Sequence, residues 1–189
     1  MPNAYAKYCP PKEEMLNGKI VAMAGALVKH NEVSQNVFTI FRNHLRKRDC
    51  KVFVDGTKLF VSEKDHVYPD VMIVCDKDKI GEKGIHGAPD LVVEVLSRST
   101  YLNDKGYKKI LYEKHGVKEY WLVDISNFII EVNLLKDGKF EVDNAYHGYN
   151  DEMVEKMDDE EKAMLVESFK TSLFDDLVIN VNDVFEGLL

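Results

Sequence analysis

Two short apolar runs constrain the fold of this chain more than any other feature. Residues 71–75 and 91–96 are continuous apolar segments of strand length, except that Glu94 interrupts the second, and Asp70 directly precedes the first. Runs of this kind are typical of β-strands that are buried on both faces of a sheet. We therefore expect a central sheet with cover on both sides, and carboxylates placed close to its core.

Hydrophobic spacing predicts two helices. Apolar residues recur every three or four positions between 31 and 48, from Val33 to Leu45, which indicates an amphipathic helix. A second helix is expected to start after Ser99 or Thr100, either of which can cap it, and to run to about residue 114 before it stops at Gly116.

The remaining apolar segments predict further strands. They are 19–24, a hairpin of 51–54 and 58–61 around Asp55-Gly56, 119–125 with 128–135, a strand after Asp137-Gly138, and a last short strand at 177–181 before a closing turn at 184–185. The first fourteen residues, with three prolines, are expected to be irregular. This order predicts one α/β domain over 1–189, with a central mixed sheet flanked by helices.

Charge is concentrated near the C-terminus. The formal net charge is −8, but residues 151–161 hold seven acids and one base, and residues 1–150 sum to +1. Overall acidity argues against a general nucleic-acid coat, yet binding depends on the local field. We expect a solvated acidic insertion near 151–166. If this insertion folded over the carboxylates, it would repel DNA.

Composition also bounds the environment of the chain. There is no apolar run of about 18 residues and no signal-like N-terminus, so we expect a cytoplasmic protein without a membrane span. Cys9, Cys50 and Cys75 are odd in number and widely spaced, which predicts reduced thiols and no zinc site.

Glu94 has two interpretations. A carboxylate inside an apolar strand is costly unless it is paired or binds a cation, so a buried salt bridge is one explanation. The other is a metal site shared with Asp70, because two acids on neighbouring strands offer the oxygen ligands that Mg²⁺ prefers. Asp104, Lys108 and Tyr112 follow at spacings of four and share a helix face. Spacing alone also allows an exposed Asp104–Lys108 pair worth about 0.3–0.5 kcal/mol.

A longer pattern resembles a known family. It comprises Tyr68-Pro69-Asp70, the segment from Gly87-Ala88-Pro89-Asp90 through Glu94 to Ser97, then Asp104, Lys108, Tyr112, Gly116-Val117 and the segment from Glu119 to Asp124. This resembles the Uma-type restriction endonucleases, a branch of the PD-(D/E)XK nuclease superfamily, over roughly residues 13–142. The superfamily places a lysine two residues after the second acid, where this chain has Leu96.

The resemblance implies a restriction-endonuclease-like fold and a nuclease site. In it, Asp70 and Glu94 would bind Mg²⁺ or Mn²⁺, and Lys108 would take over the lysine function and assist attack by water on DNA. Glu14 and His30 occupy the places of an early glutamate and of a histidine before the first helix, and Tyr112 is a third supporting residue. Glu14 could add a carboxylate, whereas His30 could contact phosphate, cap the helix or be a polar core group. By analogy, the protein would be a homodimer.

Two rivals to this interpretation remain. A non-catalytic nucleic-acid-binding or regulatory module could keep the fold and the two acids, and a phosphodiesterase could act on RNA or on branched or damaged DNA. The nuclease hypothesis makes a geometric prediction. The carboxylates of Asp70 and Glu94 should be close enough to bind the same cation, and the Lys108 ammonium should lie a few ångströms away, open to solvent.

Overall fold

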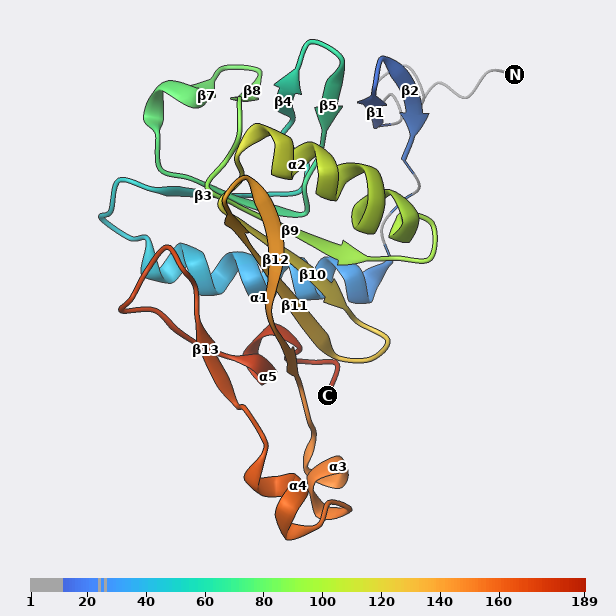
Figure 1. Cartoon of the computed structure of the whole chain (residues 1–189), viewed down its shortest axis with the longest axis vertical. Helices are drawn as coiled ribbons and strands as arrows, with labels where there is room; N and C mark the ends of the chain where they lie inside the picture. Colours follow the sequence, from blue (N-terminus) through green and yellow to red (C-terminus); the bar gives the residue numbers. More distant parts are fainter. Residues whose placement is uncertain (1–11, 24, 26) are drawn as a thin grey trace.

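The computed structural model describes residues 12–23, 25 and 27–189 as an α/β arrangement (Figure 1). The strands are β1 (Glu13–Leu16), β2 (Lys19–Ala22), β3 (Lys51–Val54), β4 (Leu59–Ser62), β5 (Asp65–Val67), β6 (Val71–Val74), β7 (Ile80–Gly81), β8 (Gly84–His86), β9 (Leu91–Leu96), β10 (Glu119–Asp124), β11 (Ile129–Lys136), β12 (Lys139–His147), β13 (Ser168–Lys170) and β14 (Val178–Asn180). The helices are α1 (Val28–His44), the 3₁₀ turn η2 (Lys77–Lys79), the π-helix η3 (Asn103–Lys108), α2 (Lys109–His115), α3 (Asp151–Glu155), α4 (Asp159–Ala163) and α5 (Val181–Val184). None of the helices in this described part is both long and apolar enough to cross a membrane.

Six strands form the central sheet, in the order β12-β11-β10-β9-β6-β3. The pair β9–β10 is parallel and the other pairs are antiparallel, so the sheet is mixed. All four residues of β6 and all six of β9 are buried. The expected central mixed sheet, built on the two apolar runs, is confirmed.

Six other strands form a second sheet, in the order β2-β1-β5-β4-β8-β7. These strands gather at one end of the molecule, above the central sheet (Figure 1). The β1–β2 hairpin turns at Asn17 and Gly18, which both have positive φ (50° and 76°), as this tight turn requires. The sequence did not predict β1, β5, β7 or β8, and it therefore did not predict this sheet.

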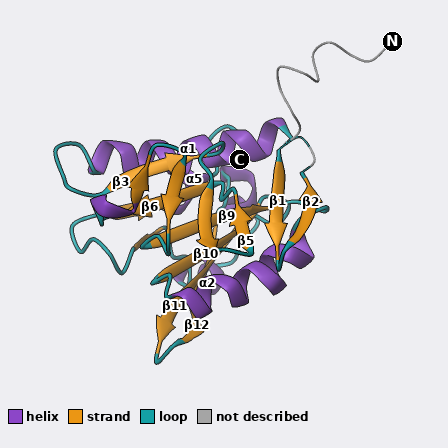
Figure 2. Cartoon of the chain, turned by 90° about the horizontal axis from the view of Figure 1, so that it is seen from above, coloured by secondary structure: helices purple, strands orange, loops and turns teal. Residues whose placement is uncertain are grey.

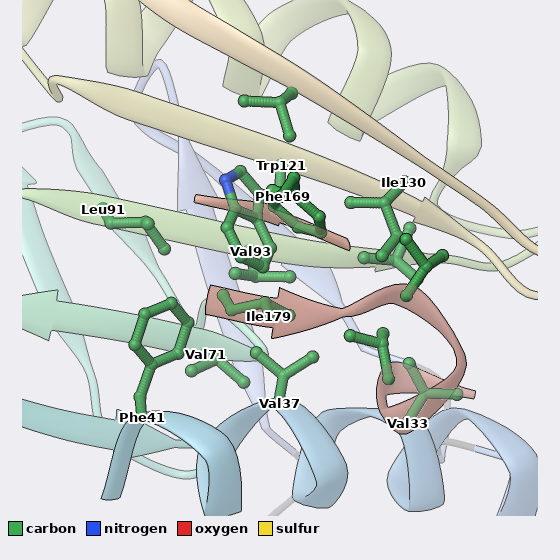
Figure 3. Close-up of a cluster of buried hydrophobic side chains, with 14 of the residues drawn as sticks. Val33, Val37, Phe41, Val71, Leu91, Val93, Trp121, Ile130, Phe169 and Ile179 are labelled. Atoms are coloured by element: carbon green, nitrogen blue, oxygen red, sulfur yellow. The ribbon is translucent and has the colours of Figure 1, made fainter. Parts of the chain in front are cut away.

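Two apolar layers cover the central sheet. On one face, α1 packs with β13, β14 and α5, and its Val33, Val37 and Phe41 point toward Val71 and Val93 of the sheet (Figure 3). On the other face lie α2 and the inner side of the second sheet. Figure 2 shows the helices on opposite sides of the strands. Because side chains alternate along a strand, odd-numbered residues of β9 face α1 and even-numbered ones, Glu94 included, face α2.

The two predicted helices are present with altered bounds. The expected helix 31–48 is α1, and it begins three residues earlier. The helix expected after Thr100 also forms and ends at Gly116, whose φ of +85° suits a helix C-terminus. Its first half is η3, a π-helix, which helical spacing did not predict.

Two other predictions were wrong. Segments 51–54 and 58–61 do not form a hairpin, because β3 pairs with β6 in the central sheet and β4 joins the second sheet. Cys50 and Cys75 are not free thiols but form a disulfide. Lys51 is paired with Val74, so the antiparallel register places the two cysteines directly opposite each other. Cys9 and Ala24 lie outside the described residues.

The acidic insertion forms two short helices, α3 and α4, at the end of the molecule remote from the second sheet (Figure 1). Asn150 and Asp158 cap them, and none of their residues is buried. The expected strand at 177–181 corresponds to β14, which pairs with β13.

Candidate active site

The register of β6 and β9 places Asp70 and Glu94 opposite each other. Val71 is paired with Val93 in this antiparallel ladder, so the residue before the first faces the residue after the second. The two acids thus come from neighbouring strands at one point of the central sheet, as the sequence predicted.

Asp70 is held by the backbone and by α1. Its Oδ2 accepts a hydrogen bond from the Val95 backbone N–H (2.7 Å) and lies 3.2 Å from Nε2 of His30. Burial lowers the pKa of His30, but the hydrogen bond and the charge of Asp70 outweigh it, so the net pKa is raised. His30 therefore supports Asp70 from the first turn of α1.

Glu94 is enclosed by the core, with 2% of its surface exposed. Its Oε1 accepts a hydrogen bond from the Tyr112 hydroxyl (2.8 Å) and one from Lys108 Nζ (3.3 Å). Burial raises the pKa of Glu94 well above its usual range; the Lys108 charge opposes this, and nearby carboxylates reinforce it. Both hydrogen bonds of Glu94 use Oε1, and both contacts of Asp70 use Oδ2. Oε2 of Glu94 and Oδ1 of Asp70 therefore take no part in these contacts.

Lys108 joins three carboxylates from three elements. Its Nζ lies 3.1 Å from Oε1 of Glu14 on β1, 3.3 Å from Oε1 of Glu94 on β9 and 3.2 Å from Oδ1 of Asp104 on η3. Burial by itself would lower the pKa of this ammonium, but the charges of Glu94, Asp104 and Glu14 have the larger, opposite effect. The net pKa of Lys108 is therefore raised, and the ammonium stays protonated. The side chain is 3% exposed, so the expectation of an ammonium open to solvent was wrong. The exposed-pair explanation for Asp104 and Lys108 was also wrong, because both are buried.

The π-helix η3 brings this lysine and its partner acid inward. Asp104 and Lys108 are its two buried residues, while Tyr120 of β10 donates its hydroxyl to the Asp104 backbone carbonyl (3.0 Å). Burial raises the pKa of the Asp104 carboxyl. Short π-helical turns are rare and often occur at functional sites. The sequence interpretation placed Asp104 on one helix face with Lys108 and in the family pattern, but it did not assign Asp104 to the site.

The donor set suits a hard divalent cation. Three acids (Glu14, Glu94 and Asp104) surround one ammonium, and Asp70, paired with His30, lies beside Glu94; when ionised, the three acids carry more negative charge than the ammonium offsets in this largely buried place. Among the described residues, no cluster of three or more His, Cys, Asp or Glu side chains has metal-binding geometry. Asp70 and Glu94 would thus supply two ligands, and water and substrate oxygens the rest, as is usual for Mg²⁺.

A cleft of about 580 Å³ opens onto this cluster. Asp70, Glu94, His30 and Lys108 line it. Its other lining residues were not predicted from the sequence; they include Lys12, Tyr68, Arg98 and Thr100. Every residue that lines the cleft comes before position 109, so the acidic helices α3 and α4 do not cover it.

Other candidates have structural roles. Asp90, on the same strand face as Glu94, accepts hydrogen bonds from the Cys75 backbone N–H (2.8 Å) and from Lys118 Nζ (2.7 Å). Trp121 and Tyr120 are fully buried core residues, as expected.

Comparisons with known proteins agree with this architecture. Two uncharacterized proteins of Synechocystis sp. are similar to this chain: one is 34% identical over 124 residues and the other 31% identical over 117 residues. The matches cover 65% and 60% of this chain, and the chain spans only 65% and 66% of the length of these relatives. A crystal structure of a putative nuclease from Anabaena variabilis superimposes with a TM-score of 0.71 at 18% identity, covering 96% of this chain and 93% of that one. This chain thus shares the fold of that crystal structure.

The family model agrees with the predicted resemblance. The Uma2 model, described as a putative restriction endonuclease, matches residues 2–157, which is most of the chain. This range includes Lys108 and the four acids of the site, Glu14, Asp70, Glu94 and Asp104. The chain therefore belongs to the Uma2 family of putative restriction endonucleases.

Proposed function

We propose that this protein is a metal-dependent endonuclease that hydrolyses phosphodiester bonds in DNA. Asp70 and Glu94 bind Mg²⁺ or Mn²⁺, and Lys108, Glu14, His30 and Tyr112 complete the site. The observation that carries the proposal is the cluster of three carboxylates around one lysine, with Asp70 beside it, at the base of a cleft. A group with this much excess negative charge is expensive to bury unless a cation joins it.

The chain's own residues orient the two ligands. His30 and the Val95 N–H fix one oxygen of Asp70, and Tyr112 and Lys108 fix one oxygen of Glu94, which leaves the second oxygen of each for a cation. When bound, a divalent cation supplies positive charge that acidifies water and stabilises the transition state of phosphodiester hydrolysis.

Lys108 serves as a fixed cation in this proposal. Its raised pKa keeps it protonated, so it does not act as a general base. It holds Glu94 in place, reduces the repulsion between the acids, and can donate to a water or a phosphate oxygen when one of its three contacts opens. By analogy with the superfamily, we further propose a homodimer that acts in the cytoplasm.

A second candidate is a nucleic-acid-binding module without catalysis. The observation that favours it is the burial of Lys108, whose three N–H groups are matched by three carboxylates. In that case the cluster serves the stability of the fold, and Lys108 never contacts a substrate.

Cleavage assays separate the two candidates. Supercoiled plasmid, single-stranded DNA and RNA are incubated with Mg²⁺, Mn²⁺ or EDTA and with the wild type, Asp70→Asn, Glu94→Gln or Lys108→Met. Asp90→Asn is the matched control, because Asp90 is a buried and paired acid outside the cluster. We expect metal-dependent nicking by the wild type and the control, and a loss of at least about 100-fold in the other variants, because orienting and charge-stabilising groups at active sites contribute effects of this size. Circular dichroism checks that each variant is folded. A wild type that cleaves nothing with either metal leaves the non-catalytic candidate.

A further inference from the structure

The outer face of the second sheet carries one continuous row of large side chains. The register pairs Ile20 with Met15, Met15 with His66, His66 with Phe60, and Phe60 with His86. These five residues lie side by side across β2, β1, β5, β4 and β8, on the face opposite to the buried residues of those strands. Ile20 and His86 are exposed and the other three are partly exposed, so the row is accessible from outside the fold.

Three rings in this row are in contact. Phe60 stacks on His86 with ring centres 4.8 Å apart and planes 7° apart, and it meets His66 edge-on at 4.8 Å. A fourth ring, Tyr68, lies directly after β5 and lines one cavity together with Phe60. We refer to His86, Phe60, His66 and Tyr68 as the aromatic strip.

Cations accompany these rings. The Lys58 ammonium stands 5.7 Å from the centre of the Phe60 ring and 5.4 Å from that of Tyr68. Lys12, which is paired with Asp55, stands 5.9 Å from the Tyr68 ring. All three distances are in the range of cation–π attraction, so positive charge is held against the strip.

Tyr68 connects the strip to the candidate active site. Its backbone N–H donates to Oε1 of Glu14 (3.0 Å), and its side chain lines the same cleft as Asp70 and Glu94. It also lines a second cavity, of about 570 Å³, together with Phe60 and Lys58. Tyr68 therefore belongs both to the aromatic strip and to the wall of the cleft that holds the acids.

We infer that the aromatic strip binds a single-stranded stretch of the polynucleotide whose phosphodiester lies in the cleft; this inference rests on the proposed nuclease function. Exposed rings with lysines beside them offer stacking surfaces for bases and positive charge for phosphates, the two features that bind a single strand. An intact duplex keeps its bases stacked inside, so it can offer only its backbone to such a surface. The substrate class is therefore a strand that is unpaired next to the cleavage point.

Binding in EDTA tests this inference without any need for cleavage. Fluorescence anisotropy measures the dissociation constants of labelled oligo-dT, oligo-U and a duplex of equal length. Phe60→Ala is expected to weaken single-strand binding roughly 5- to 150-fold, the range for loss of one stacked base. Lys58→Ala is expected to lower the slope of log affinity against log salt by about 0.7, which is the effect of one phosphate contact with a single strand.

Matched variants separate loss of the ring from loss of the fold. Phe60→Leu keeps most of the apolar volume, so it should remain folded and still bind weakly. Tyr149→Ala removes a ring that stacks on His147 (6.0 Å) outside the second sheet, and it should bind as the wild type does. Equal affinity of the Phe60 variants and the wild type for both single strands would overturn the inference, as would tighter binding of duplex than of either single strand. A wild type that cleaves nothing but binds single strands through Phe60 would overturn only the nuclease proposal.

Discussion

Replacing Lys108 with methionine tests how the acid cluster is held together. Lys108→Met keeps the apolar stem of the side chain and removes the only ammonium near Glu14, Glu94 and Asp104 among the described residues. Three carboxylates then stay buried without their counter-charge. We expect this variant to be less stable than the wild type, and more so at higher pH.

The magnitude follows from the contacts. The ammonium lies 3.1–3.3 Å from the three carboxylates. One such pair attracts with about 5 kcal/mol at an effective dielectric constant of about 20. The desolvation of four ions and the mutual repulsion of the acids offset most of this attraction, and breaking a buried pair costs about 3–5 kcal/mol in practice. We therefore expect a free energy of unfolding that is about 3–5 kcal/mol lower at pH 7.5.

The pH dependence gives the sharper test. Burial already raises the pKa values of Glu94 and Asp104, and loss of the ammonium raises them further. A carboxyl whose pKa is higher in the folded state than in the unfolded state destabilises the fold as the pH rises through that folded value. The difference between variant and wild type should thus be smaller at pH 4.5 than at pH 7.5.

Urea denaturation in EDTA at the two pH values measures both effects. The matched control is Lys105→Met, which removes the same charge from the same π-helix but loses a partly exposed pair with Glu131 (3.3 Å) and a cation–π contact with Tyr101 (5.4 Å). This control should cost no more than about 1 kcal/mol. The reasoning is refuted if the two variants lose equal stability, or if the loss in Lys108→Met is the same at both pH values.

Three further predictions address the metal, a charged hydrogen bond and a close backbone approach. Mn²⁺ at 100 times its dissociation constant should raise the free energy of unfolding of the wild type by about 2.7 kcal/mol, and thermal melts should show no such shift for Glu94→Gln. Burial raises the pKa of Asp65, but hydrogen bonds, including one from the Tyr107 hydroxyl (2.6 Å), lower it overall. Tyr107→Phe should therefore cost about 1.5–3 kcal/mol at pH 7 in urea titrations, and less as the pH falls through the folded pKa of Asp65. Gly84→Ala should cost at least about 1–3 kcal/mol, because the new methyl group would overlap the carbonyl oxygen of Lys58.

Simple controls accompany these three measurements. Gly106→Ala meets no atom within 4 Å, so its stability should equal or exceed that of the wild type. Tyr101→Phe removes a tyrosine hydroxyl from the neighbouring helical turn and should be neutral. A metal-induced shift that survives in Glu94→Gln, or a Tyr107→Phe cost that grows toward acid pH, would contradict the corresponding assignment.

The strands that carry the two acids follow from local sequence. The apolar run after Asp70 and the one that contains Glu94 give strands β6 and β9, because strands buried on both faces are apolar at nearly every position. The spacing of Asp104, Lys108 and Tyr112 places them on one helix face, and the structure brings all three to Glu94 or its neighbours. Local pattern therefore placed these residues on one face, and the family resemblance assigned Lys108 and Tyr112 to the site.

Pairing and burial could not be predicted in the same way. Asp55-Gly56 is a good hairpin turn, but β3 and β4 have better partners in two different sheets. The Cys50–Cys75 disulfide depends on the β3–β6 register, which no local signal reveals. The burial of Lys108 depends on the second sheet, since Glu14 of β1 closes over it.

The antiparallel register of β6 and β9 has a consequence for how this protein can diverge. A slip of one residue would turn either Asp70 or Glu94 to the α1 side of the sheet, because successive side chains alternate. Insertions and deletions within these two strands should therefore abolish activity even where the apolar pattern survives. The connecting segment 75–90 carries no such constraint from this pair, so changes in its length can alter the second cavity, which residues 80–85 help to line, while the two acids stay opposed. Among natural or engineered variants, length changes should accordingly accumulate in that connection and be absent from the strands.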